Sequence, residues 1–259
     1  MHRRRTVWQC KDCGAQTSVT AGTVMHGTRQ ALRLWFWAAY LVATHHPGIS
    51  AVQLRRQLGI GCHETAWMML HKLRRAMVAP EREPLKCEVE VDEFFEGGIE
   101  EGLRGGRQRG KKALVGVAIE IRGRGSGRVR LQILPDASAD SLGALVTATT
   151  TSGAIVHTDG WPGYAGIGAL GYEHRPRSKS AVHVGDELLP RAHRAVSNFK
   201  AWMHGTHRGA SHEHLPAYLD EFTFRHNRRG NPHAAFQTLL GLSARHEPAT
   251  YRQIIDHAA

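Results

Sequence analysis

Two apolar, β-branched runs that each end in an aspartate constrain the folding of this chain more than any other feature. Asp92 follows the first run, in VEVDEFFEGG, and Asp159 follows the second, in AIVHTDGWPGY. Carboxylates at strand ends can hold divalent cations, and two Mg²⁺ ions about 4 Å apart catalyse phosphoryl transfer. Taken singly, each aspartate is more often a solvated residue or the first residue of a turn. The two together favour a metal site about as strongly as they favour these structural roles.

The sequence around the aspartates predicts an α/β sheet. Val89 and Val91 alternate with Glu90 and Asp92, which is the period-2 pattern of a half-buried strand. The glycine-rich segment GRGSG predicts a hairpin. We expect strands over 86–95, 113–121, 128–134 and 154–158, and a helix over 139–150. Strand, hairpin, helix and strand in this order are typical of a ribonuclease H-like (RNase H-like) mixed sheet flanked by helices.

The N-terminal third predicts a small helical domain. Ser50 is a good N-cap for a short helix, and Gly59 and Gly61 predict a turn after it. We expect helices over 28–44, 51–58 and 63–77, and three more over 190–204, 212–225 and 232–242. A helix, a glycine turn and a helix that ends in basic residues are typical of a helix-turn-helix, which enters the major groove of DNA.

The chain is strongly basic, with a formal net charge of +11 at pH 7. This charge favours a polyanionic partner, and we expect double-stranded DNA bound through phosphate contacts. General stickiness of a basic protein is the alternative. Because the basic clusters recur along the chain, we expect an extended binding track rather than one tail. The candidate DNA-binding residues are Arg55, Arg56, Lys72, Arg74, Arg75, Arg225, Arg228 and Arg229.

Cys10 and Cys13 form a CxxC pair. A zinc site needs a second pair of cysteine or histidine ligands to complete a tetrahedron. Cys62 and Cys87 are isolated in the sequence, and His26 has no close partner. We therefore expect a Zn²⁺ half-site at Cys10 and Cys13, or the second half of a ribbon whose first cysteine pair lies upstream.

Several absences in the sequence predict a cytoplasmic, nucleoid-associated protein with no membrane partner. The longest apolar run, 34–43, is half the length needed to span a bilayer. The arginine-rich start leads into polar sequence and not into the apolar core of a signal peptide. Four cysteines, of which two are closely spaced, do not make a disulfide framework.

An ordered series of blocks resembles the ISXO-type insertion-sequence transposases of bacteria. WQCKDCGAQTSVTAGTVMHGTR, LRLWFWAAYLVATHHPGISAVQLRRQLGI and TAWMMLHKLRRAM resemble the N-terminal half of that family. VEVDEFFEGG, VHTDGWPGY and GTHRGASHEHLPAYLDEFTFRHNRR resemble its DDE catalytic half. The resemblance implies a zinc ribbon and a helix-turn-helix that bind terminal inverted repeats. It also implies an RNase H-like domain that cuts DNA and joins its 3′-OH ends to a target, with Mg²⁺ or Mn²⁺ as cofactor.

The resemblance implies four regions along the chain. They are a partial zinc ribbon over 1–25, a helix-turn-helix domain over 26–80, an RNase H-like DDE-type catalytic domain over 86–230 and a C-terminal helical tail over 231–259. The ribbon is partial because the family carries two cysteine pairs, and the sequence has one, Cys10 and Cys13.

The third catalytic position also departs from the family. The family pattern has a glutamate, with a lysine seven positions later, shortly before a Gly-Thr pair. Counted back from that pair, the lysine is Lys200 and the acidic position is His193. The resemblance therefore implies a triad of Asp92, Asp159 and His193. Asn198 and Glu221 are the competing candidates for the third residue.

Two other functions remain open at this point. A copy without the complete ribbon and with His193 in place of an acidic residue could be an inactive remnant that binds the terminal repeats as a repressor. A Holliday-junction or RNA nuclease of the same fold would lack the N-terminal DNA-binding domain. Because transposition joins paired ends, we expect a homo-oligomer on DNA.

Overall fold

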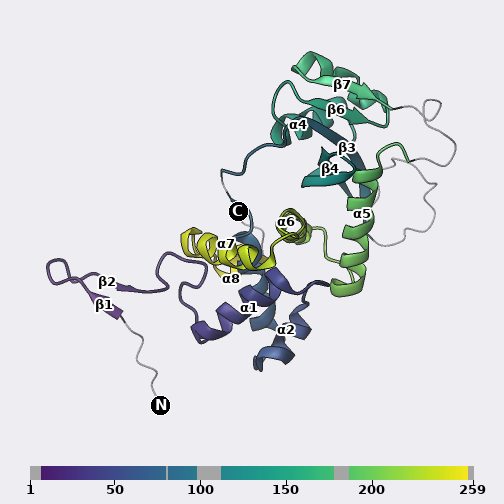
Figure 1. The fold of residues 1–259 in the computed structure, drawn as a ribbon. Helices are drawn as coiled ribbons and strands as arrows, with labels where there is room; N and C mark the ends of the chain where they lie inside the picture. Colours follow the sequence, from purple (N-terminus) through teal and green to yellow (C-terminus); the bar gives the residue numbers. More distant parts are fainter. Residues whose placement is uncertain (1–6, 80, 98–111, 178–186, 256–259) are drawn as a thin grey trace. The chain divides into compact units, whose positions relative to one another are not determined.

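The structure is a computed structural model and describes residues 7–79, 81–97, 112–177 and 187–255. The chain divides into two compact units, Met1–Ala79 with Asn231–Ala259, and Pro80–Gly230 (Figure 1). Each unit is described by itself. The residues that the sequence sets apart as a C-terminal tail thus form one unit with the N-terminal helices.

The first unit contains a small hairpin and five helices among its described residues. The hairpin pairs β1 (Val7–Gln9) with β2 (Gln16–Ser18), and the helices are α1 (Leu32–Thr44), α2 (Ala51–Leu58), α3 (His63–Arg75), α7 (Pro232–Arg245) and α8 (Tyr251–Ile255). Ser50 and Gln53 form a capping box at the start of α2, and Gly59 ends the helix with a φ of 63°. Helix α1 packs against α7, and α2 packs against α3.

The second unit is built on a five-stranded mixed sheet with the order β5-β4-β3-β6-β7. Its strands are β3 (Glu88–Glu96), β4 (Ala113–Arg122), β5 (Gly125–Leu134), β6 (Ile155–Thr158) and β7 (Glu173–Pro176). Strands β3, β4 and β5 pair antiparallel, whereas β6 pairs parallel with β3 and with β7. This topology, with an antiparallel hairpin followed by parallel strands, confirms the RNase H-like α/β fold expected from the sequence.

Helices cover both faces of this sheet. The helical segments are α4 (Ala139–Thr149), the 3-10 segment η1 (Pro162–Leu170), α5 (Pro190–Trp202), the π-helical segment η3 (Met203–His207) and α6 (Leu215–Asn227). One apolar core joins α5 and α6 to the sheet and includes Phe94 and Val117. A second core joins α4 and η1 to the other face and includes Val89 and Val91. The alternation along β3 therefore separates these valines from Glu90 and Asp92, as the sequence predicts.

The observed elements lie within a few residues of the predicted ones, and β1, β2, β7, η1 and α8 are additional. Strand β7 (Glu173–Pro176) has the sequence EHRP, which lacks the apolar alternation that marks a strand. No helix among the described residues is long and apolar enough to cross a membrane.

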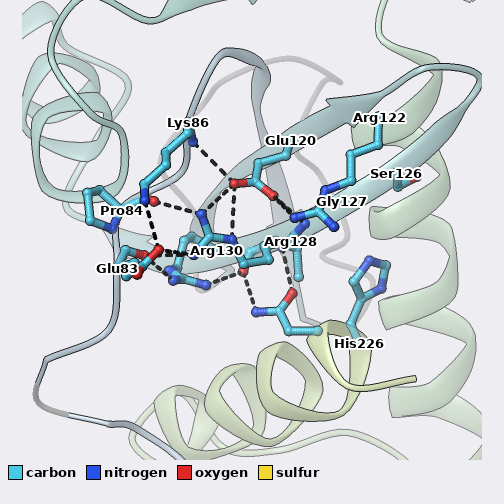
Figure 2. A network of polar contacts seen from close by, with 12 residues as sticks. Glu83, Pro84, Lys86, Glu120, Arg122, Ser126, Gly127, Arg128, Arg130 and His226 are labelled. Atoms are coloured by element: carbon cyan, nitrogen blue, oxygen red, sulfur yellow. Dashed lines mark hydrogen bonds and ion pairs between the residues drawn. The ribbon is translucent and has the colours of Figure 1, made fainter. Parts of the chain in front are cut away.

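A buried glutamate ties the segment before β3 to the β4–β5 hairpin (Figure 2). Glu120 Oε1 accepts hydrogen bonds from Arg128 Nη2 at 2.6 Å and from the Lys86 backbone N–H at 3.2 Å. Arg128 Nη2 also donates to the Pro84 carbonyl at 2.8 Å. Burial by itself raises the pKa of Glu120, but the hydrogen bonds from Arg128 and Lys86 outweigh it and lower that pKa to about 2.

Candidate active site

The parallel pairing of β3 with β6 brings the two aspartates together. The ladder pairs Glu88 with Ile155, Val89 with Val156 and Glu90 with His157. If the same register continued by two residues, Asp92 would lie opposite Asp159. Strand β6 ends at Thr158, so both aspartates lie just beyond the last paired residues, where the two strands separate. Both carboxylates therefore lie at one end of the β3–β6 pair.

Asp92 is held in a partly buried, acidic environment. Its side chain is 16% exposed, and its Oδ1 accepts a hydrogen bond from the Glu93 backbone N–H at 2.9 Å. Burial raises the pKa of Asp92 to about 6, and the neighbouring carboxylates of Glu93 and Asp159 add to this rise. The Glu93 N–H and the His193 imidazole oppose it. An accumulation of negative charge of this kind is stabilised by a cation.

Asp159 is positioned by a tight turn that follows β6. Its Oδ1 accepts a hydrogen bond from the Trp161 backbone N–H at 3.0 Å. Gly160 has a φ of 78°, a conformation that favours glycine. Pro162 then begins η1, and its ring fixes φ for the first helical residue. The TDGWP sequence is therefore a turn signal as well as an acidic position.

His193 is the third residue that the structure brings to this point. Its Nε2 lies 3.3 Å from Asp92 Oδ2, and its Nδ1 lies 3.8 Å from Glu187 Oε2. The imidazole is 41% exposed, so it is accessible to a ligand from solvent. The structure thus places His193 next to Asp92, one of the two aspartates that the family resemblance groups with it.

Glu90 determines where α5 begins, and the sequence interpretation assigned it no role. Its Oε2 accepts hydrogen bonds from the backbone N–H groups of Arg191 at 2.7 Å and of Ala192 at 2.9 Å. Its Oε1 accepts one from Arg191 Nη1 at 2.9 Å. A carboxylate at a helix N-terminus satisfies N–H groups that lack a helical partner and interacts well with the helix dipole. Since Glu90 and Asp92 lie on the same face of β3, this contact sets His193 opposite Asp92. In the sequence, the role of Glu90 is indicated only by its position as a second acidic residue two positions before Asp92.

The structure does not bring Lys200 to the aspartates. Its Nζ lies 5.3 Å from the centre of the Phe94 ring, and its charge acts on Glu96 at the far end of β3. Of the two competing candidates for the third position, Asn198 is exposed on α5. Glu221 is fully buried on α6, with its Oε1 3.5 Å from Arg225 Nη1.

The donor set of Asp92, Asp159 and His193 suits a divalent ion, because carboxylate oxygens are preferred by Mg²⁺ and a neutral imidazole also ligates Mn²⁺. The 3.3 Å between His193 Nε2 and Asp92 Oδ2 is close to the roughly 3 Å that separates adjacent ligands of an octahedral ion. Within the described parts of the chain, no three histidine, cysteine, aspartate or glutamate side chains form a group that could hold a metal ion. The three residues fit a divalent ion by the chemistry of their donor atoms, and His193 and Asp92 are the pair whose distance suits adjacent ligands.

The basic residues predicted to bind DNA in the first unit differ in exposure. Arg55 and Arg56 are exposed on α2. Lys72 is half-buried, and burial lowers its pKa. Arg75 is half-buried, and Arg74 is 1% exposed inside the helical core. Arg74 therefore cannot reach a DNA phosphate in this conformation, because the apolar face of α3 carries it inward.

The arginines at the end of α6 are engaged within the second unit. Arg225 lies beside Glu221, and the Arg228 guanidinium carbon lies 4.1 Å from the centre of the Phe224 ring. Arg229 is exposed, and its Nη1 and Nη2 donate to the carbonyls of His226 at 2.7 Å and of Ser126 at 2.5 Å. The Arg229 bond to Ser126 attaches the end of α6 to β5, whereas Arg225 and Arg228 contact residues of α6 itself. The sequence pattern does not distinguish these structural roles from phosphate binding.

Cys10 and Cys13 lie in the exposed turn between β1 and β2. The Gly14 N–H donates to the Cys10 carbonyl at 3.1 Å, and Gly14 has a φ of 69°. Hydrogen bonds from the backbone of Cys13 and Asp12 lower the pKa of the Cys10 thiol. The turn thus favours a thiolate, and in the part of the chain that is described no further ligand completes a Zn²⁺ site around it.

The chain is similar to known proteins in sequence and in structure. Residues 84–227 match the ISXO2-like transposase domain. An uncharacterized protein in transposable element ISH50 of Halobacterium salinarum is 26% identical over 233 residues, which cover 83% of this chain and 76% of that protein. A pre-cleavage Mos1 transpososome structure is similar with a TM-score of 0.26 and 11% identity, over 84% of this chain and 81% of that one. The Mos1 Strand Transfer Complex is similar with a TM-score of 0.23 and 13% identity, over 84% of this chain and 80% of that one.

Proposed function

Because this chain belongs to the ISXO2-like transposase family, we propose that it cuts the DNA ends of an insertion sequence and joins them to a target. The observation that carries this proposal is the cluster at the end of the β3–β6 pair. Asp92 lies within β3, Asp159 directly follows the parallel neighbour β6, and His193 Nε2 lies 3.3 Å from Asp92 Oδ2. An acidic cluster at a strand end is a suitable site for phosphoryl transfer.

In this proposal Asp92, Asp159 and His193 hold divalent ions, Mg²⁺ or Mn²⁺. When bound, the ions would supply Lewis-acid stabilisation of the charge that develops on phosphoryl oxygens. Asp92 and Asp159 act as ionised ligands, and His193 acts as a neutral imidazole. The raised pKa of Asp92, about 6 because of burial and its acidic neighbours, means that the site is best loaded above that pH.

We assign contact with the terminal repeats to the helix-turn-helix formed by α2 and α3. Arg55 and Arg56 are exposed on α2, where they are available for phosphate contacts. The net charge of +11 supports a polyanionic partner. Transposition joins two ends of one element, so we expect at least two copies of the chain to act together on DNA.

Asp92→Asn and Asp159→Asn test the catalytic assignment. Each variant keeps the size of the side chain and removes the charge of a ligand, so we expect strand transfer to be lost. Binding of the terminal repeats, measured by gel shift, should remain. Asp140→Asn on the exposed first turn of α4 is the matched control and should retain transfer. Strand transfer by either Asp92→Asn or Asp159→Asn would contradict the proposal.

A second candidate is an end-binding repressor without catalytic activity. The observation that favours it is the direct contact of His193 with Asp92, in a position where the family pattern has a glutamate. Cleavage of repeat-ended DNA should be assayed first with Mg²⁺ and then with Mn²⁺, which accepts an imidazole ligand more readily. Cleavage with either ion supports the transposase, and binding without cleavage in both supports the repressor.

A further inference from the structure

The two segments that carry Asp92 and Asp159 are joined by a hydrogen bond outside the sheet. The Tyr164 hydroxyl donates to Glu93 Oε2 at 2.5 Å. Glu93 directly follows Asp92 on β3, and Tyr164 lies in η1, five positions after Asp159. We infer that Glu93 and Tyr164 are positioning residues, and that their hydrogen bond keeps the segment that carries Asp159 beside the segment that carries Asp92, so that both carboxylates can ligate a divalent ion.

The β3–β6 ladder does not extend to the two aspartates. Its last pair is Glu90 with His157, and both aspartates lie two residues further along. After β6 the chain turns at Gly160, whose φ is 78°. A contact beyond the end of the ladder is therefore needed if Asp159 is to remain next to Asp92.

Tyr164 is anchored well enough to serve this purpose. Its side chain is fully buried in the core between the sheet and α4. The preceding residue, Gly163, lies so close to α4 that a Cβ there would come within 2.9 Å of the Ala137 carbonyl and of Leu142. The Trp161 indole N–H also donates to the Ala137 carbonyl, at 3.3 Å. Segment η1 thus packs closely against the start of α4, and this packing anchors Tyr164.

The chemistry of the pair also suits a permanent contact. Burial and the carboxylate of Glu93 raise the pKa of the Tyr164 hydroxyl far above its ordinary value, so it remains a hydrogen-bond donor. Glu93 offers a charged acceptor, and hydrogen bonds to a charged group are the stronger kind. Because Glu93 Oε2 is engaged by Tyr164, we assign it to positioning rather than to direct ligation.

This inference rests on the proposed function, since it assumes that Asp92 and Asp159 hold the ion. Residues that orient metal ligands typically change metal affinity 10- to 100-fold when they are removed. We therefore expect Tyr164→Phe, which removes one oxygen atom, to weaken Mn²⁺ binding by about tenfold. Glu93→Ala should weaken it similarly, and the double variant should be no weaker than Glu93→Ala, because both changes remove the same bond.

The test is a Mn²⁺ titration of the full chain without DNA, followed by electron paramagnetic resonance of the free ion. Tyr172→Phe is the matched control, because the Tyr172 hydroxyl is also buried and donates to the Thr150 carbonyl at 3.2 Å, away from the aspartates. Asp92→Asn reports whether the binding measured is at the proposed site. Tenfold weaker binding in Tyr164→Phe with unchanged binding in Tyr172→Phe supports the inference.

Other results would overturn the inference, and some of them would also overturn the metal site of the proposed function. If Asp92→Asn abolishes Mn²⁺ binding but Tyr164→Phe behaves like Tyr172→Phe, the positioning role is wrong and the catalytic assignment stands. The same holds if the effects of Glu93→Ala and Tyr164→Phe simply add. If the parent chain binds no Mn²⁺, or if Asp92→Asn leaves binding unchanged, both the positioning role and the metal site of the proposed function are wrong.

Discussion

Removal of the Glu90 carboxylate should release the N-terminus of α5 and with it His193. Glu90 is fully buried and accepts the N–H groups of Arg191 and Ala192 as well as the Arg191 guanidinium. In Glu90→Ala these two N–H groups lose their acceptor in a region that water does not reach. Arg191 keeps other partners, because it also donates to the carbonyls of Gly123 and Gly125.

The size of the effect follows from these contacts. Each buried N–H group left without an acceptor costs about 1–3 kcal/mol, which gives about 2–6 kcal/mol for the two. Removal of one partner from a buried ion pair costs about 3–5 kcal/mol. This range and the one for the two N–H groups estimate the same loss, so they are not added. We expect Glu90→Ala to destabilise the α5 region by about 3–5 kcal/mol. Glu90→Gln keeps one acceptor oxygen and should cost about 1–3 kcal/mol.

Amide hydrogen exchange with mass spectrometry measures the stability of α5 by itself, so the measurement does not require the two units to unfold together. Peptides that cover α5 should exchange faster in Glu90→Ala, by a factor that corresponds to the expected loss of stability of the α5 region. Glu88→Ala is the matched control on the same strand: Glu88 is 43% exposed and lies 3.2 Å from His157. Because the Glu88 carboxylate is partly exposed to solvent, we expect this pair to contribute about 0–1 kcal/mol. Equal exchange of α5 in Glu90→Ala and Glu88→Ala would refute the role given to Glu90.

Three further predictions concern the metal, the DNA and the pH. His193→Glu restores a hard oxygen ligand and should raise cleavage with Mg²⁺ relative to Mn²⁺; an unchanged ratio counts against His193 as a ligand. Arg55→Ala with Arg56→Ala should weaken binding of all DNA sequences alike and lower the salt-dependence slope of log K by about 2, as measured by gel shift across salt concentrations. Glu120 has a folded pKa of about 2, below its ordinary 4.5, so its stabilising contribution is present above pH 4.5 and is lost as pH falls towards 2. In urea unfolding, the parent chain should lose about 1–2 kcal/mol of its free energy of unfolding between pH 4.5 and pH 2, and Glu120→Gln should not show this loss. The figure is smaller than the full pKa shift implies, because Arg128 is partly solvated.

Much of the fold follows from local pattern. Helix α2 begins at Ala51 and ends at Leu58 as expected, because Ser50 caps it and Gly59 takes a positive φ. Strands β3 and β4 follow their apolar alternation and their apolar run. Strand β7 could not be found in this way, because its polar residues pair with β6 only when the rest of the sheet is present.

The candidate site was only partly predictable. Asp92 and Asp159 stood out because each ends a β-branched run. The burial of Arg74, by contrast, depends on how α3 packs within the helical unit. A basic residue near a helix end reads as a surface residue until its neighbours are known.

The sequence alone therefore determined most of the strands and helices, the two aspartates and the family resemblance, because these depend on residue spacing and on short ordered motifs. The tertiary structure decided which side chains meet. Residues about 70 to 100 positions apart are joined by the β3–β6 pairing, which ends two residues before Asp92 and Asp159, by the capping of α5 by Glu90 and by the hydrogen bond from Tyr164 to Glu93. Contacts at such separations depend on the packing of helices on both faces of one sheet, which no local pattern encodes.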